Sequence, residues 1–249
     1  MQDQRAKIHV IGHSHIAALG AAASIREEGG DRFAFFELQK PPYKPAISGG
    51  VVNPALLERI TAILESIENP AFALSIGGAF HSVVALANHP SPYYVVGPWL
   101  GYDPGSEQLI PFSLMREVMR EKMSWQLEVI RTIADVLPQR VINLQPPPPL
   151  PDAEFIKESP GVYQEVIEAH GVMPAEVRYT VWRIQSDLFE EACRENDIEF
   201  LHAPPATVDD RGFLAREAWR ADPTHGNAWY GEQVLQQVER YFETRKRAS

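Results

Sequence analysis

Short apolar runs alternate along this chain with longer segments in which apolar residues recur every three or four positions. The short runs predict strands at about 7–11, 33–38, 72–76, 141–144 and 199–201. The periodic segments predict helices at about 16–28, from 54 onward, and at 112–136, 175–195 and 228–245. Strands that alternate with helices are typical of a parallel sheet with helices packed on its faces. The pattern therefore predicts an α/β fold with a mainly parallel sheet.

Turn and capping residues mark several boundaries between these elements. Gly29-Gly30 is expected to end the first helix, and Asn53 to cap the second. The prolines of segment 39–50 fix φ and remove hydrogen-bond donors, so we expect a loop that delivers Gly49 and Gly50 to the carboxyl edge of the sheet. Four consecutive prolines at 146–149 predict a stiff, extended segment after the fourth strand.

The chain is long enough for one α/β domain with insertions. It has 249 residues, of which 45% are hydrophobic, and no internal repeat divides it. We therefore expect a single domain over 1–249, with insertions at about 89–111 and 146–174. The first insertion is expected either to roof a site or to pack on the domain's own flank, and 152–172 to be irregular or weakly helical. Aromatic residues of the first insertion are Tyr93, Tyr94, Trp99 and Tyr102.

Charge and cysteine content disfavour several classes of protein. The formal net charge is −10, and nucleic-acid binding depends on Lys and Arg that neutralise phosphates, so no nucleic-acid partner is expected. Cys193 is the only cysteine and lies in a predicted helix, which indicates a core thiol. Residues 1–6 are polar, and no segment has the roughly 20 apolar residues of a membrane span. We therefore expect a cytoplasmic protein without a membrane partner.

Ser14 lies where the first strand meets the first helix, in the sequence Gly12-His13-Ser14-His15. A strand that enters a helix through a glycine-led turn exposes one side chain and directs the free N–H groups of the helix toward its target. Such a position suits a serine nucleophile. Serine is also a favoured N-cap residue, so for this segment alone a purely capping role is the simpler interpretation.

Asp222 and His225 lie three residues apart in the loop before the last helix. A serine hydroxyl is a weak nucleophile at neutral pH and needs an adjacent base, and the base needs a third group that fixes its tautomer. One loop that carries a carboxylate and an imidazole can supply both groups. The alternative interpretation is a simple turn that begins at Asp222-Pro223.

Together, these two segments resemble the SGNH hydrolases, the GDSL-type serine esterases, and the resemblance extends from Ile8 to the last helix. It implies a three-layer α/β/α sandwich with a five-stranded parallel sheet. It also implies hydrolysis of a carboxylic ester through an acyl-enzyme, with Ser14 as nucleophile, His225 as base and Asp222 as its partner. No cofactor and no metal are implied, and the substrate would be a small-molecule or glycan ester.

The same resemblance implies an oxyanion hole made largely of backbone N–H groups. Its donors would be Ser14, a glycine after the second strand that is either Gly49 or Gly50, and Gly78 at the corner after the third strand. The chain departs from the family at this corner, where Ala79 stands in place of an asparagine donor. If nothing replaces that donor, slow turnover is expected, and Ala79→Asn should raise it by up to about 10²–10³-fold.

Four further residues are candidates for supporting or alternative roles. His81 or Asn143 could replace the missing donor, and His13 stands where the family has an aspartate. His13 and His15 also resemble a metal-ligand pair, so a metal-dependent hydrolase is a less favoured alternative. An acyltransferase or a non-catalytic binder on the same fold is the other alternative. The sequence leaves the acyl group, the alcohol and the oligomeric state open.

Overall fold

The computed structural model describes residues 7–48, 51–68, 70–96, 108–137 and 141–246. At its centre is a five-stranded sheet of order β2-β1-β5-β8-β9, in which every neighbouring pair is parallel. The predicted α/β class and parallel sheet are confirmed. The strands are β1 (Ile8–Gly12), β2 (Phe33–Glu37), β5 (Ala71–Ser75), β8 (Val141–Leu144) and β9 (Glu199–Leu201).

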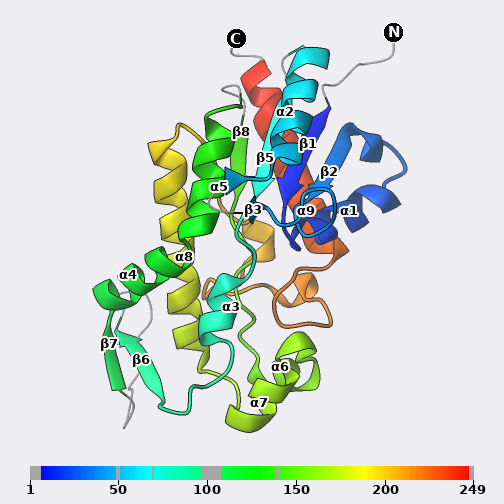
Figure 1. Cartoon of the computed structure of the whole chain (residues 1–249). Coiled ribbons are helices and arrows are strands. Elements are labelled where there is room, and N and C mark those ends of the chain that lie inside the picture. The colour runs from blue at the N-terminus through cyan, green and yellow to red at the C-terminus, as the bar shows by residue number, and fades with distance from the viewer. Residues whose placement is uncertain (1–6, 49–50, 69, 97–107, 138–140, 247–249) are drawn as a thin grey trace.

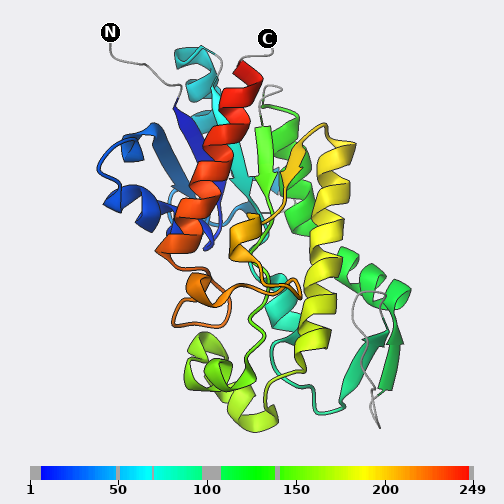
Figure 2. The same cartoon turned by 180° about the vertical axis from the view of Figure 1, so that it is seen from behind.

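Helices cover both faces of this sheet, as Figure 1 and Figure 2 show from opposite sides. On one face lie α1 (Ile16–Ile25) and α9 (Ala228–Lys246), and on the other lie α2 (Pro54–Ser66), α5 (Ser124–Ala134) and α8 (Ala175–Glu195). Each face has its own apolar cluster. Ile8 and Val10 of β1 face the first cluster, and Ile11 faces the second, because successive side chains of a strand point to opposite faces. The result is the three-layer arrangement that the sequence resemblance implies.

The ends of the early helices follow from local hydrogen bonds. The Asn53 side chain accepts a hydrogen bond from the Ala55 N–H at 2.9 Å and caps α2, as predicted. Helix α1 ends at residue 25 rather than 28, because Arg26 adopts an extended conformation. Its guanidinium pairs there with Glu232 and Glu239 of α9.

One sequence prediction about helices was wrong, and another left open what the structure resolves. The predicted helix 112–136 is divided into α4 (Phe112–Lys122) and α5, because the fully buried Met123 leaves helical geometry with φ −92° and ψ 4°. Segment 152–172, predicted to be irregular or weakly helical, contains the two short helices α6 (Ala153–Glu158) and α7 (Gln164–His170). Asp152 caps α6 by accepting hydrogen bonds from two backbone N–H groups. A helix this short shows no clear apolar periodicity, so the sequence pattern does not reveal it.

The described parts of the first insertion, 89–96 and 108–111, pack on the flank of the domain. Its strands β6 (Tyr93–Val96) and β7 (Gln108–Pro111) pair in parallel beside α4 (Figure 1). Tyr94 is buried, and the Tyr93 hydroxyl donates to the Val84 carbonyl at 2.9 Å. These two tyrosines therefore pack in or against the hydrophobic core. Trp99 and Tyr102 lie outside the described residues. A short pair, β3 (Ile47–Ser48) and β4 (Val51–Val52), and helix α3 (Phe80–Ala85) complete the elements near the carboxyl edge.

Arg178 of α8 anchors both ends of the second insertion. The prolines 146–149 run through the interior as a buried segment without regular structure, as expected of a stiff, extended chain. The buried guanidinium of Arg178 then donates to the carbonyl oxygens of Leu150 and Pro151 at one end of the insertion and of Met173 at the other. Burial lowers the pKa of this guanidinium to about 10.

Two predictions from composition can be compared with the structure. Cys193 is fully buried in α8, and burial raises the pKa of its thiol to about 12, so it is a core thiol as predicted. Within the described ranges, no helix combines the length and the apolar character that a bilayer span requires.

Helix α9 lies directly against the backbone of α1. A Cβ atom at Gly231 of α9 would stand 2.1 Å from the Ala18 carbonyl oxygen of α1. Only glycine permits this approach without a backbone shift. Since Ser14 precedes α1 and His225 precedes α9, the contact also sets the separation of these two residues.

We expect Gly231→Ala to lower the free energy of unfolding by about 1–3 kcal/mol, because overpacking must separate α9 from α1. Gly20→Ala is the matched control, since nothing lies within 4 Å of a Cβ atom at that helical position. The control should raise stability by about 0.5–1 kcal/mol through helix propensity. Urea unfolding of both variants measures this, and a Gly231→Ala protein as stable as the control would contradict the tight contact.

Candidate active site

Ser14 lies at the carboxyl edge of the sheet, between β1 and α1. The His13 N–H donates to the Ser75 carbonyl oxygen at 3.1 Å, which ties this turn to the end of β5. Gly12 is required because a Cβ atom there would lie 2.6 Å from the same carbonyl oxygen. The N-cap position of α1 is occupied by His15, so Ser14 is not a capping residue.

Ser14, His225 and Asp222 form a continuous hydrogen-bonded chain, although 211 positions separate Ser14 from His225. His225 Nε2 lies 2.8 Å from Ser14 Oγ, and His225 Nδ1 lies 3.0 Å from Asp222 Oδ1. A tautomer with its proton on Nδ1 donates to the carboxylate and leaves Nε2 free to accept from the serine hydroxyl. In this arrangement an imidazole can remove the serine proton.

Asp222 is the fixed negative charge of this chain. Its Oδ1 atom also accepts hydrogen bonds from the backbone N–H groups of Thr224 and His225, each at 2.9 Å, and Arg220 Nε lies 3.3 Å from Oδ2. Burial acts to raise the pKa of the carboxyl, but the hydrogen bonds from His225 and Thr224 outweigh it and lower the pKa to about 2. Asp222 is therefore ionised throughout the neutral pH range.

The loop that carries His225 is fixed to the start of α9. The Asn227 side chain accepts the Tyr230 N–H at 3.0 Å, and the Asn227 N–H donates to the Ala218 carbonyl oxygen at 2.9 Å. Between His225 and Asn227 the chain needs Gly226, because a Cβ atom there would lie 2.5 Å from the Tyr230 ring. The imidazole is thus held by the backbone on both sides of it.

Backbone N–H groups suited to an oxyanion face this edge. In the part of the chain that the structure describes, the N–H groups of Ser14, Gly78 and Ala79 have no hydrogen-bond partner. Gly78 adjoins the serine turn, since a Cβ atom added at Gly78 would lie 4.0 Å from the His13 Cβ atom. Gly49 and Gly50, the other predicted donors, lie outside the described residues.

His13 and His15, on either side of Ser14, are buried and have different neighbours. His13 Nδ1 accepts from the Gly77 N–H at 3.4 Å, and its ring meets Trp125 edge-on at 5.4 Å. The His15 ring lies 5.1 Å from the His225 ring and interacts with the backbone of Gly78. Burial lowers the pKa of His13 to about 4 and that of His15 to about 3, so both imidazoles are neutral.

The two imidazoles therefore do not form a common ligand set. A zinc site needs three or four donors that converge on one point. Over residues 7–246, apart from the short gaps in the description, no group of three or more His, Cys, Asp or Glu side chains is arranged to hold a metal ion. The metal-ligand interpretation of His13 and His15 has no geometric support in this part of the chain.

The structure separates the two candidates for the missing donor. His81 lies on α3 and lines a small cavity together with Pro223 of the His225 loop, and burial lowers the pKa of its imidazole to about 3. Asn143 lies within β8, in register with Leu74 and next to the Cys193 thiol. Its side chain is completely buried one residue before the end of β8, so its role as a donor stays a prediction.

Sequence reasoning missed Gln185 and Trp125, which contact the site from the helices on the opposite face. Gln185 of α8 hydrogen-bonds to the backbone of the corner after β5, and Trp125 of α5 covers the His13 ring. Neither residue stands out in the sequence, because each belongs to an ordinary amphipathic helix. Only the packing of α5 and α8 on the sheet brings them to the serine turn.

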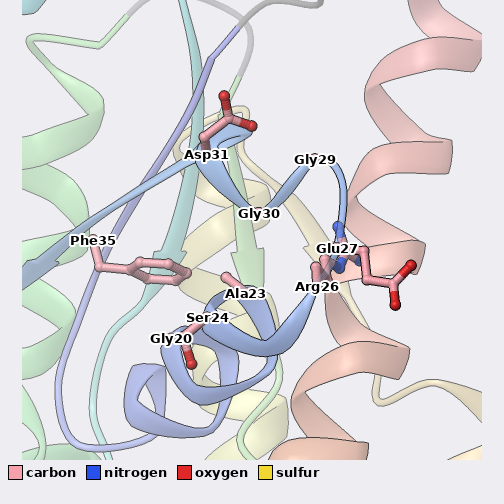
Figure 3. Close-up of a pocket in the computed structure, with 9 residues that line it drawn as sticks. All are labelled: Gly20, Ala23, Ser24, Arg26, Glu27, Gly29, Gly30, Asp31 and Phe35. Atoms are coloured by element: carbon pink, nitrogen blue, oxygen red, sulfur yellow. The ribbon is translucent and has the colours of Figure 1, made fainter.

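A surface pocket of about 490 Å³ lies away from this constellation (Figure 3). It is at the C-terminal end of α1, and none of its lining residues belongs to the Ser14 chain of hydrogen bonds. Arg26, its cation, is already paired with Glu232 and Glu239. The pocket lining is Gly20, Ala23, Ser24, Arg26, Glu27, Gly29, Gly30, Asp31 and Phe35.

Comparison with known proteins relates the fold to hydrolase structures. No protein-family model and no curated protein matches the sequence. A solved structure from Streptococcus pneumonia, named for platelet activating factor, aligns over 97% of this chain and 86% of its own, with 15% identity and a TM-score of 0.50. A GDSL-like lipase from Bacteroides thetaiotaomicron aligns over 94% and 88%, with 11% identity and a TM-score of 0.47. The M. Smegmatis aryl esterase aligns over 96% and 99%, with 12% identity and a TM-score of 0.45.

At 15% identity the likeness concerns the fold alone. The Streptococcus structure covers nearly the whole chain, and the strand order places Ser14 at the carboxyl edge of the sheet, where α/β proteins bind ligands. The predicted three-layer α/β/α sandwich with a five-stranded parallel sheet is thereby confirmed. What the site does is a separate question, which depends on its own geometry.

Buried neutral imidazoles give the protein a specific response to acid. His9 lies between the rings of Phe36 and Phe72 without a hydrogen-bond partner, and burial with Lys7 and Arg59 lowers its pKa to about 4. In the unfolded chain such an imidazole binds a proton near pH 6.5, whereas in the folded protein it stays neutral to about pH 4. Below pH 6.5 the unfolded state therefore binds more protons than the folded state, and the free energy of unfolding decreases as the pH is lowered.

We expect the free energy of unfolding to be insensitive to these groups above pH 6.5 and to fall between pH 6.5 and about 4. Each buried imidazole contributes up to about 1.4 kcal/mol per pH unit. His9→Leu should reduce this slope, whereas substitution of the exposed His170 by glutamine should leave it unchanged. Urea unfolding at pH 7.5, 6 and 5 measures the slopes, and equal slopes for His9→Leu and wild type would contradict the assignment.

Proposed function

We propose that this protein is a serine hydrolase that cleaves carboxylic esters through an acyl-enzyme. The observation that carries the proposal is the pair of hydrogen bonds that Ser14 donates to His225 Nε2 and that His225 Nδ1 donates to Asp222, at 2.8 and 3.0 Å. A hydroxyl, a base and an orienting carboxylate at these distances form the arrangement that activates serine in acyl transfer. The SGNH-type fold is compatible with this chemistry.

In the first half of the reaction, His225 Nε2 takes the Ser14 proton while Ser14 Oγ bonds to the ester carbonyl carbon. The carbonyl oxygen becomes the oxyanion of a tetrahedral intermediate. When this intermediate collapses, the bond to the alcohol oxygen breaks, and His225 returns its proton to the departing alcohol. In the second half, His225 removes a proton from water, which attacks the acyl-enzyme and releases the acid and free Ser14.

The oxyanion would be bound by backbone N–H groups of the serine turn and of the corner after β5. Ser14 and Gly78 offer such groups without partners in the described residues, and Gly49 or Gly50 would complete the set. Preorganised donors of this kind lower the barrier because they do not have to reorient as the negative charge develops.

The charges around Ser14 favour a carboxylic ester over a phosphate ester. The imidazoles of His13, His15 and His81 are neutral at working pH, so they offer no charge to a phosphate dianion. Arg220 is already engaged by the carboxylate of Asp222 at 3.3 Å. A neutral ester carbonyl, whose single developing charge can be met by N–H dipoles, suits this environment better. Acyl esters of small molecules or of glycans are the proposed substrates.

A fluorophosphonate should label the protein once, at Ser14, and Ser14→Ala should abolish the mass shift. His225→Ala should slow labelling by about 10³-fold or more, because the hydroxyl loses its base. Ser24→Ala is the control, since Ser24 lies on α1, the helix that follows Ser14, and among the described residues its hydroxyl bonds only to the Ala21 carbonyl oxygen. Intact-protein and peptide mass spectrometry decide the outcome. Label at another residue would refute the proposal, and undiminished labelling of His225→Ala would remove His225 from the base role.

Chelator treatment should leave hydrolysis of an aryl acetate unchanged, because the proposed steps use only side chains and backbone N–H groups of this chain. The measurement is kcat/KM before and after dialysis against a chelator, with metal analysis of the same sample. Stoichiometric zinc together with activity that disappears on chelation and returns with zinc would favour the metal-dependent alternative instead.

A further inference from the structure

The side chain of Gln185 in α8 forms two hydrogen bonds to the backbone of the corner that connects β5 to α3. Its Nε2 atom donates to the Gly78 carbonyl oxygen at 2.9 Å, and its Oε1 atom accepts a hydrogen bond from the backbone N–H of His81 at 2.7 Å. The side chain is completely buried. A buried amide that is used at both ends is held in one orientation, so it fixes the two peptide groups that it contacts.

The corner needs such support because its backbone is unusual. Gly77 has a φ of +100° and Gly78 a φ of +53°, which is the left-handed region. Gly77 is also pressed against Phe189 of α8, since a Cβ atom there would lie 2.0 Å from the ring. No regular hydrogen-bond pattern continues through these residues, so contacts with α8 determine how their peptide groups point.

The peptide between Gly78 and Ala79 is the one that Gln185 orients. A trans peptide is planar, and its C=O and N–H bonds point in opposite directions. Because the Gly78 carbonyl points at Gln185, the Ala79 N–H points away from it. Among the described residues, this N–H has no hydrogen-bond partner.

The same corner adjoins the serine turn. Strands β5 and β1 are neighbours, with Ser75 opposite Gly12, and the Gly77 N–H donates to His13 Nδ1 at 3.4 Å. A free backbone N–H at this edge is suited to a negative charge that develops beside Ser14. The side chain of Ala79 offers no donor, so any donor from this position must come from the backbone.

We propose that Gln185 is a positioning residue for the oxyanion site: it holds the Gly78–Ala79 peptide so that the Ala79 N–H serves as the donor at the corner after β5. The inference rests on the proposed serine hydrolase function. Gln185 does not touch the reacting atoms, and its effect passes through the peptide that it orients.

Gln185→Met tests the proposal, because methionine has a similar length and cannot hold the corner. We expect kcat on an aryl acetate and the rate of fluorophosphonate labelling to fall by about 10²-fold, with KM nearly unchanged. Ser186→Ala is the matched control, since Ser186 is the next residue on α8 and is buried, and in the described part of the chain its hydroxyl bonds only to Gln145. The control should lose comparable stability and retain its activity.

Gln185→Glu provides a second test that does not depend on the first variant folding well. Its protonated carboxyl can donate to the Gly78 carbonyl oxygen, whereas its ionised form cannot. The ratio of its kcat to that of wild type should therefore fall as the pH rises, while the corresponding ratio for Gln185→Met should stay flat. A purely structural role for Gln185 would give two flat ratios and would overturn the proposal.

Adding a side-chain donor should compensate for the lost one. Ala79→Asn should raise kcat more in the Gln185→Met background than in wild type, because wild type already has a donor at this position. Equal gains in both backgrounds would overturn the proposal, as would Gln185→Met with wild-type kcat. If wild type is not labelled at Ser14, the proposed function itself fails. Labelling of wild type with an unchanged Gln185→Met rate refutes only the inference about Gln185.

Discussion

The close contact between α1 and α9 is the constraint on which the site depends. Ser14 stands just before α1 and His225 just before α9, so the distance between their side chains is set by how closely these helices approach. Gly231 permits α9 to rest on the α1 backbone at Ala18. A hydrogen bond of 2.8 Å tolerates little displacement, and steep dependence on placement is characteristic of catalytic groups. Packing of two helices thus determines the geometry of the chemistry.

The two halves of the site are organised in different ways. The segment from Asp222 to His225 orders itself, because one carboxylate oxygen accepts hydrogen bonds from the backbone and the imidazole of its own loop. The corner at Gly77 and Gly78 has no comparable local network and is held by Gln185 and Phe189 of α8. The base is therefore positioned by residues near it in the sequence, and the corner by a helix about a hundred residues away.

This difference explains what the sequence could predict. Bounds of β8, β9 and α8 agree with the predicted ones, because caps, prolines and periodicity are local signals. Ser14, Asp222 and His225 stand out by their spacing, and the structure brings them within hydrogen-bond distance. The break at Met123 and the role of Gln185 depend on which elements pack together, and neither leaves a local pattern. The complete burial of Asn143 is likewise a property of strand register that its local sequence does not show.

Arg178 fixes both ends of the second insertion to the domain. One guanidinium holds the carbonyl groups of Leu150, Pro151 and Met173, so the segment between them enters and leaves the domain at a single fixed point. Changes in length or composition between these anchors, which include α6 and α7, need not disturb the sheet. They would reach the site, because a Cβ atom at Gly161 of this insertion would lie 3.6 Å from Pro223 and 3.8 Å from Asp222. A change in the shape of the second insertion can therefore alter the surroundings of Asp222 while the strands of the sheet keep their register.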